Sequence, residues 1–386
     1  MEFFVKLFAQ DKADGVYVLQ AQKCTAAILF WANEKGALPD WTSFAYIPLD
    51  SCGRGRFHFQ GGRSVPPEAT HVYVRAVHDD FIGYEEGLYE MPINGRRRLV
   101  QEEVHLCVMS DLHLSSKTGV LKRAFAMAQG ADALLLAGDM TNDGTTRQHE
   151  LLKQCLEELL PDMQVFSVTG NHDVPRTAEE QGDRHEIWNH LMFQRWLFER
   201  MEKGEWQYGP DGAYAASFGD IEIIGLQAVT EKRKFLFEGG KQLEWLNRLL
   251  SKTPKARWRI ILCHAPLLQH NPKREEGKSP YLNRDKQLQE IVDRHGKIIF
   301  ISGHTHLSMN NPTGCVEWDA VSSNLYINDA SIRPTDLLPG EQMQPAEWKD
   351  GTFLDIRISG LDVEIVTRSV SSGKKHARGY YHFILS

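Results

Sequence analysis

The chain has 386 residues, of which 42% are hydrophobic and 25% are charged, which is typical of a soluble globular protein with two or three domains. Its formal net charge of −7 argues against a dedicated binder of nucleic acids or of membrane surfaces.

We expect neither a signal peptide nor a membrane span. The apolar stretch 1–8 is interrupted by Glu2 and Lys6 and has no basic segment before it. No apolar run reaches the roughly 18 residues that a bilayer requires. Six scattered cysteines form no close pairs, and three of them lie inside apolar patterns: Cys107, Cys155 and Cys263. The cysteines are therefore expected to be reduced, which favours a cytoplasmic location.

Residues 1–100 have the pattern of an all-β domain. Short runs rich in aromatic and β-branched residues occupy 16–19, 27–31, 44–47 and 72–77. Turn residues separate them at intervals of roughly 8–12 residues, a spacing typical of sandwiches. This region contains neither metal-ligand spacing nor a nucleophile with a base. We predict a β-sandwich-like accessory domain over 1–100.

From residue 104 onward, strands alternate with helices. The apolar runs predict strands at 104–109, 133–137, 165–169, 258–263 and 298–302, and amphipathic segments between them predict helices. Additional short strands are expected at 214–218, 221–226, 315–320 and 325–328. The pattern predicts a layered α/β domain with a mixed sheet over 101–340. Residues 341–386 are predicted to form a small C-terminal β extension packed on that domain.

Polar side chains follow each predicted parallel strand of the α/β domain. The ligand crevice of open α/β sheets lies at this carboxyl end of the strands. The residues in question are Asp111 and His113, Asp139 with Asn142 and Asp143, Asn171 with His172 and Asp173, His264, and His304 with His306. These side chains are carboxylates, imidazoles and carboxamides, so the sequence predicts a common site.

This set of residue types fits two adjacent metal ions. Asp-x-His and His-x-His place two ligands on one side of an extended backbone. Glycines at 138, 170 and 303 allow sharp turns from strand to loop. A single carboxylate such as Asp139 can bridge two cations about 3.5–4 Å apart. Because the ligands are oxygen and imidazole nitrogen without thiolate, Mn, Fe or Zn is favoured over Cu(I) or an iron–sulfur cluster.

In order and spacing, these blocks resemble the calcineurin-like metallophosphoesterase superfamily. The blocks are Asp111-x-His113, Gly138-Asp139-x-x-Asn142-Asp143, Gly170-Asn171-His172-Asp173, His264 and Gly303-His304-x-His306. The chain is more similar to the bacterial phosphodiesterase branch than to protein phosphatases. The second block lacks the arginine of the phosphatases, and the third ends in Asp173 instead of glutamate.

The resemblance implies two sets of ligands. A first metal would be bound by Asp111, His113, Asp139 and His306. A second would be bound by Asp139, Asn171, His264 and His304, with Asp139 bridging the two ions. His172 would lie outside both sets, near the leaving-group oxygen. The catalytic residues implied are His172 and Asp139.

Several nearby residues receive other predicted roles. Asp143 and Asp173 are expected to orient their neighbours, as carboxylates around metal ligands commonly do. Arg176, together with Asn171 and His172, is a candidate contact for the substrate phosphate. His105 and Cys263 lie within predicted strands and are expected in the core.

The function favoured is hydrolysis of a phosphoester that depends on two metal ions, with a phosphodiester such as a cyclic nucleotide as the first choice of substrate. A hydroxide between the metals would attack phosphorus in line, and His172 would protonate the leaving group. Three alternatives stay open: a phosphomonoesterase of the same fold, a non-catalytic metal-binding scaffold that acts through the β domain, and a metal-dependent nuclease, which the acidic charge disfavours. The expected partner is a phosphorylated small molecule, with no membrane and no nucleic acid, and the sequence predicts no oligomeric state.

Overall fold

The protein is represented by a computed structural model. It describes residues 5–11, 16–21, 24–32, 44–49, 53–58, 71–78, 84–90, 103–175, 187–200, 206–230, 234–252, 258–271, 282, 284–306, 316–319, 321–329, 331–333, 351–360 and 362–384.

The chain forms two compact units. The smaller contains residues 1–104, 357–364 and 381–386, and the larger contains residues 105–356 and 365–380. The predicted domain limits at residues 100 and 340 stay predictions.

The described part of residues 1–100 consists of β-strands. These strands are β1 (Val5–Asp11), β2 (Val16–Ala21), β3 (Cys24–Ala32), β4 (Phe44–Pro48), β5 (Arg54–His58), β6 (His71–His78) and β7 (Tyr84–Glu90). They form a three-stranded sheet of order β1-β2-β5 and a four-stranded sheet of order β4-β3-β6-β7, and all pairings are antiparallel. This region thus has the all-β character that its alternating aromatic and β-branched runs predict.

A six-stranded sheet of order β10-β9-β8-β20-β21-β22 brings together segments far apart in sequence. Its strands are β8 (Val104–Met109), β9 (Ala133–Leu136), β10 (Gln164–Ser167), β20 (Thr352–Ser359), β21 (Asp362–Ser369) and β22 (Lys375–Ile384). Strands β8, β9 and β10 are parallel, so their carboxyl ends meet at one edge.

A seven-stranded mixed sheet has the order β11-β12-β13-β16-β17-β19-β18. Its strands are β11 (Trp206–Tyr208), β12 (Tyr214–Phe218), β13 (Ile221–Leu226), β16 (Trp258–Cys263), β17 (Ile298–Ser302), β18 (Val316–Asp319) and β19 (Asn324–Asn328). The four strands β13, β16, β17 and β19 are parallel. A separate hairpin consists of β14 (Val229–Thr230) and β15 (Lys234–Phe235).

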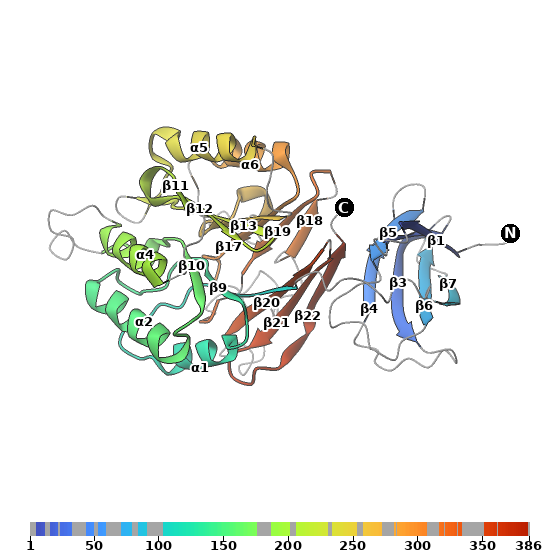
Figure 1. Ribbon diagram of the computed structural model, residues 1–386, viewed down its shortest axis with the longest axis horizontal. Coiled ribbons are helices and arrows are strands. Elements are labelled where there is room, and N and C mark those ends of the chain that lie inside the picture. Colours follow the sequence, from blue (N-terminus) through green and yellow to red (C-terminus); the bar gives the residue numbers. More distant parts are fainter. Residues whose placement is uncertain are drawn as a thin grey trace, which may run out of the picture. The chain divides into compact units, whose positions relative to one another are not determined.

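Helices cover the outer faces of the two sheets (Figure 1). They are α1 (Gly119–Ala128), α2 (Thr146–Leu159), α4 (Trp188–Arg200), α5 (Lys241–Leu250) and α6 (Asp285–His295). α1, α2 and α4 lie beside β8, β9 and β10, and α5 and α6 pack on the seven-stranded sheet. The result is a layered mixed α/β fold, which confirms the predicted fold class.

The two sheets approach each other at β10 and β13. The ring of Phe166 lies against that of Phe218, with the centroids 6.1 Å apart. Beyond β10, the backbone N–H and the hydroxyl of Thr169 both donate to Gln227 Oε1, at 2.7 and 2.6 Å. Buried polar groups of this kind need a partner. Here the donors follow β10 and the acceptor follows β13, so the hydrogen bonds join the two sheets. The two sets of strand ends are therefore fixed close together.

The structure bears on three smaller predictions. In the described chain, Cys107, Cys155 and Cys263 are buried and free, in agreement with reduced cysteines. Cys263 belongs to the core as predicted, whereas His105 is half-buried and its Nε2 lies 3.0 Å from Asp355 Oδ1. Among the described helices none combines the length and the apolarity needed to cross a membrane.

Candidate metal centre

The residues predicted as ligands lie just beyond the carboxyl ends of β8, β9, β10, β16 and β17. Backbone hydrogen bonds connect the loops that follow β8 and β9: Asp111 N donates to Gly138 O at 3.1 Å, and His113 N donates to Asp139 O at 3.0 Å. Gly303 N donates to His264 O at 3.0 Å and connects the loops of β17 and β16 in the same way. Each pair of neighbouring strands thus continues its pairing into the site.

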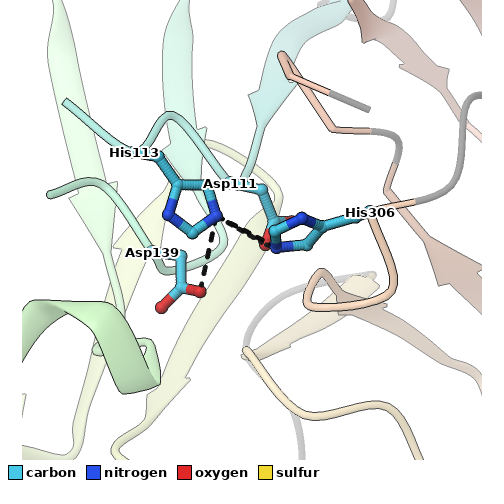
Figure 2. A group of neighbouring side chains, drawn as sticks. All are labelled: Asp111, His113, Asp139 and His306. Carbon is cyan, nitrogen blue, oxygen red and sulfur yellow. Dashed lines mark hydrogen bonds and ion pairs between the residues drawn. The ribbon is translucent and has the colours of Figure 1, made fainter. Parts of the chain in front are cut away.

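Four side chains form a first group of possible donors, shown in Figure 2: Asp111, His113, Asp139 and His306. One donor atom from each lies within 4.8 Å of all the others. The Nε2 atoms of His113 and His306 are 3.0 Å apart, and His306 Nε2 is 3.1 Å from Asp111 Oδ1. Two imidazole nitrogens and two carboxylate oxygens therefore point at one small volume, as a cation would require.

A second group shares Asp139 with the first and adds His264 and His304. His264 Nε2 lies 3.4 Å from Asp139 Oδ2. Asn171 begins the short 3₁₀ helix Asn171–Asp173, and the backbone N–H of the next residue, His172, donates to Asp139 Oδ1 at 2.7 Å. The structure thus brings Asp139 between two donor groups and holds the Asn171 segment against it.

The backbone of the site is unusual. Nine non-glycine residues of the described chain have a positive φ, and five of them are predicted ligands: Asp111, His113, Asp139, His304 and His306. Their φ values lie between 43° and 72°, in the left-handed region that residues with a Cβ atom rarely adopt. Such strain concentrates at functional sites, where the surrounding structure enforces it.

Two of the three expected glycine turns need glycine for different reasons. Gly138 has a φ of +93°, and a Cβ atom there would lie 2.5 Å from Nδ1 of His264, so this position combines a turn with close packing. Gly170 has a negative φ, but a Cβ atom there would lie 2.2 Å from both N and Oδ1 of Asp139. Gly170 is therefore required for close approach and not for a turn.

Burial and the neighbouring charges set the protonation of the site. Burial disfavours ionisation of Asp111, but the hydrogen bond and charge of His306 outweigh it and keep the pKa of Asp111 well below its usual range. Burial likewise opposes ionisation of Asp139, yet the charge of His264 lowers the pKa of Asp139 to about 2. Both carboxylates are therefore ionised at neutral pH, as metal ligands must be.

The histidines fall into two classes. Burial lowers the pKa of His113 to about 4 and that of His304 to about 3, so both are neutral at pH 7. For His264, burial also acts downward, but the charge of Asp139 dominates and raises the pKa to about 9. Binding of a cation beside Asp139 would therefore release a proton from His264.

With this geometry established, the comparisons with known proteins decide the family. Residues 104–308, more than half of the chain, match the calcineurin-like phosphoesterases. The chain belongs to the calcineurin-like phosphoesterase family. This membership confirms the resemblance seen in the five sequence blocks.

Two curated relatives match part of the chain at low identity. The chain is 25% identical over 176 residues to a probable cyclic nucleotide phosphodiesterase of Ruthia magnifica, covering 45% of this chain and 62% of the relative. It is 23% identical over 245 residues to a 3′,5′-cyclic-nucleotide phosphodiesterase of Nostoc, covering 61% and 79%. The chain thus spans less than two thirds of the length of the Ruthia relative.

Among solved structures, a purple acid phosphatase from yellow lupin seeds has a similar fold. The TM-score is 0.51 at 12% sequence identity, covering 98% of this chain and 73% of the phosphatase. At this identity the likeness shows the fold alone.

The unsatisfied buried polar atoms of the site give a test for metal binding that is independent of the family. Buried polar atoms normally have hydrogen-bond partners. Within the described chain, five buried atoms of predicted ligands have none: Asp111 Oδ1, Asp139 Oδ2, Asn171 Oδ1, His264 Nε2 and His304 Nδ1. Asp139 Oδ2 and His264 Nε2 face each other at an ion-pair distance. Oxygen and imidazole donors with unsatisfied lone pairs are what divalent cations require.

His172 lies beside the first donor group. Its Nδ1 is 2.9 Å from the backbone oxygen of Asn142, to which it donates, and its ring stands edge-on to that of His113, with the centroids 4.5 Å apart. The carbonyl thereby fixes the ring orientation and leaves Nε2 for another partner. The structure thus places His172 beside the predicted ligand His113, and its role stays a prediction.

Asp173 fastens two loops together. Its carboxylate accepts hydrogen bonds from the backbone N–H groups of Gly170 at 2.9 Å and Thr141 at 2.8 Å and from the Thr141 hydroxyl at 2.9 Å. Asp143 accepts from Asn142 Nδ2 at 2.9 Å and from Gln148 Nε2 at 3.0 Å. Both carboxylates orient their neighbours, and the groups they orient in the structure are backbone and carboxamide groups. Arg176 lies outside the described residues.

Sequence reasoning missed several residues that contact the ligands. Ser110 donates to Asp111 Oδ2 at 2.7 Å, and Arg333 donates to the carbonyl of His113 at 3.2 Å. Asn328 Nδ2 donates to Gly303 O at 2.8 Å, beside His304. A signal existed for Asn328, because it ends an apolar strand in the same manner as the predicted ligands. No local pattern identifies Arg333, which is 220 residues from its partner.

Proposed function

We propose that this phosphoesterase hydrolyses a phosphodiester, such as a cyclic nucleotide, at a centre of two metal ions. The proposed ligands are Asp111, His113, Asp139 and His306 for one ion, and Asp139, Asn171, His264 and His304 for the other. Because the donors are oxygen and imidazole nitrogen, we propose Mn, Fe or Zn as the metals.

The observation that carries the proposal is the position of Asp139. It belongs to both donor groups, and its backbone has the left-handed conformation of the site. A carboxylate shared by two cation sites is the arrangement that two-metal phosphoryl chemistry uses. The names of the relatives support the choice of substrate, since the Ruthia and Nostoc proteins are described as cyclic nucleotide phosphodiesterases.

The side chains of the chain itself would do the following. When bound, two cations would neutralise phosphoryl charge and lower the pKa of water. His172 would donate from Nε2 to the leaving-group oxygen while Nδ1 stays bonded to Asn142 O. Asn171 would present its unpartnered Oδ1 to the second ion and would donate from Nδ2 to the phosphate. Arg176 would add a positive charge for the phosphate.

The test is turnover of a chromogenic phosphodiester and of the matching monoester with Mn²⁺ supplied. We expect diester cleavage that falls by at least about 100-fold in Asp139→Asn, because the bridging charge is lost. Asp293→Asn is the matched control, since Asp293 is on the exposed face of α6 and accepts from Tyr326 OH. Turnover of the monoester alone would favour a phosphomonoesterase. Absence of turnover despite two bound ions would favour a metal-binding scaffold.

A further inference from the structure

The β14–β15 hairpin places an aromatic side chain at the site. Phe235 pairs with Val229 across the hairpin, and Leu236 N donates to Ala228 O at 2.7 Å directly after it. The side chain of Phe235 is only 9% exposed. The strand pairing and the hydrogen bond of the next residue thus fix the backbone at Phe235. The hairpin itself contributes no predicted ligand.

Phe235 packs against the two histidines of the second donor group. Its ring stands edge-to-face to that of His304, with the centroids 4.6 Å apart and an interplanar angle of 78°. Its centroid lies 6.0 Å from that of His264, and the centroids of the two histidines are 5.2 Å apart. Aromatic pairs of this geometry attract one another. In the described structure, the ring contacts of Phe235 are with these two residues and with neither His113 nor His306.

The two histidines differ in what holds their rings. His264 Nδ1 donates to Ala137 O at 2.7 Å, a bond that turns Nε2 toward Asp139. Metal-binding imidazoles are ordinarily oriented by such a hydrogen bond. Nδ1 of His304 is buried and has no hydrogen-bond partner among the described residues, so it is the ring atom left for a cation. The ring that carries it is packed against those of Phe235 and His264, with centroids 4.6 and 5.2 Å away, and this packing supports its orientation.

We propose that Phe235 is a positioning residue for the second cation and that it acts by holding the His304 ring in the orientation that ligation requires. This inference rests on the metal centre of the proposed function. It assigns to the hairpin a role for one of the two ions only, because the contacts of Phe235 are with the second group. Phe235 touches no reacting atom and is not a catalytic residue.

The experiment is a titration of the full, metal-free chain with Mn²⁺. Calorimetry measures the two affinities, and electron paramagnetic resonance detects the coupled Mn pair. We expect Phe235→Ala to weaken one of the two sites by about tenfold, the lower end of the effects seen for groups that orient ligands, and to leave the other unchanged. Phe235→Tyr retains the ring and should restore both affinities. If Phe235→Ala does not fold, Phe235→Leu replaces it in the same titration.

Phe198→Ala is the matched control for loss of a buried ring. Phe198 is also 9% exposed, and its ring contacts include Tyr208 and Tyr214. We expect this variant to lose stability without a change in either Mn²⁺ affinity. Equal loss of affinity in Phe198→Ala and Phe235→Ala, or no loss in Phe235→Ala, would overturn the proposal.

A double-mutant cycle identifies the affected site. In a His304→Ala background, Phe235→Ala should cause no further loss of affinity, because its target ring is absent. In a His306→Ala background, it should still weaken the remaining site by about tenfold. The reverse result would overturn the proposal. The titration needs no substrate, so two bound ions without turnover would contradict the proposed function alone, whereas a chain that binds fewer than two ions would contradict both.

Discussion

At the scale of single residues, the site combines donor chemistry with backbone strain. Asp111, His113, Asp139, His304 and His306 share a left-handed conformation that favours glycine. The sequence blocks could predict which side chains converge, because their order along the chain resembles that of a known family. They could not predict the strain, which arises only when the loops of β8, β9 and β17 meet.

The strain predicts an order of stability between two variants of one position. His113→Ala and His113→Gly both remove the imidazole, but only glycine adopts a φ of 43° without steric cost. We expect His113→Gly to have the higher free energy of unfolding, by about 1 kcal/mol. Urea unfolding with a chelator present measures the difference. An alanine variant as stable as the glycine variant would show that the backbone at His113 is relaxed.

At the scale of elements, the site depends on how closely neighbouring strand ends approach. The loop after β10 passes against the loop after β9, where Gly170 meets Asp139 and Asp173 accepts from Thr141. The strands themselves were predictable from their apolar runs. The contacts of Arg333 and Phe235 could not be predicted, because they join segments that are far apart in the sequence and no local pattern indicates that these segments meet.

Gly170→Ala tests this close approach. The added methyl group would overlap N and Oδ1 of Asp139, so the shared carboxylate must move. We expect a loss of roughly 1–3 kcal/mol in the free energy of unfolding and weaker binding of both ions. Gly119→Ala is the control, because a Cβ atom at Gly119, the first residue of α1, meets nothing within 4 Å. Thermal unfolding and Mn²⁺ titration measure the two effects. Unchanged Mn²⁺ affinity in Gly170→Ala would show that the added methyl group does not displace the Asp139 carboxylate.

At the scale of the whole molecule, layers of helix and sheet bury ionisable groups away from the site. His149 of α2 and His190 of α4 both lie beside Phe193, with ring centroids 5.9 and 6.4 Å from its own. Burial lowers the pKa of His149 to about 4 and that of His190 to about 3. Both histidines are thus neutral in the folded protein at pH 5 and protonated in the unfolded chain.

This difference predicts acid sensitivity of the α2–α4 layer. Between the unfolded pKa of about 6.5 and the lower folded values, the unfolded state binds more protons. The contribution of these two histidines to the free energy of unfolding is therefore fully present above pH 6.5 and falls as the pH is lowered, by on the order of 1 kcal/mol per pH unit for each histidine. His190→Leu should reduce this slope. Urea unfolding of metal-free protein from pH 7 to pH 4.5 measures this slope. Identical slopes in the unchanged protein and in His190→Leu would show that His190 does not contribute to the acid sensitivity.

Metal removal gives a second test at this scale. Cations bound at the shared site would stabilise the folded chain by about 2.7 kcal/mol when their concentration is 100 times the dissociation constant. We therefore expect EDTA to lower the melting temperature and Mn²⁺ to restore it. The melting temperature of Asp139→Asn should respond much less, and an equal response would place the stabilising ion elsewhere.

The separation of the ligands along the chain has a consequence for synthesis. His306 Nε2 lies 3.0 Å from His113 Nε2, although 193 residues separate them, and His304 follows Asp139 by a similar interval. A ribosome that has translated the first 300 residues has therefore made neither of the two proposed ligand sets in full. The nascent chain cannot capture a cation with its full ligand set until the loop after β17 has emerged. A full ligand set thus becomes available only when five strands of the seven-stranded sheet and the three parallel strands β8, β9 and β10 of the six-stranded sheet have been made.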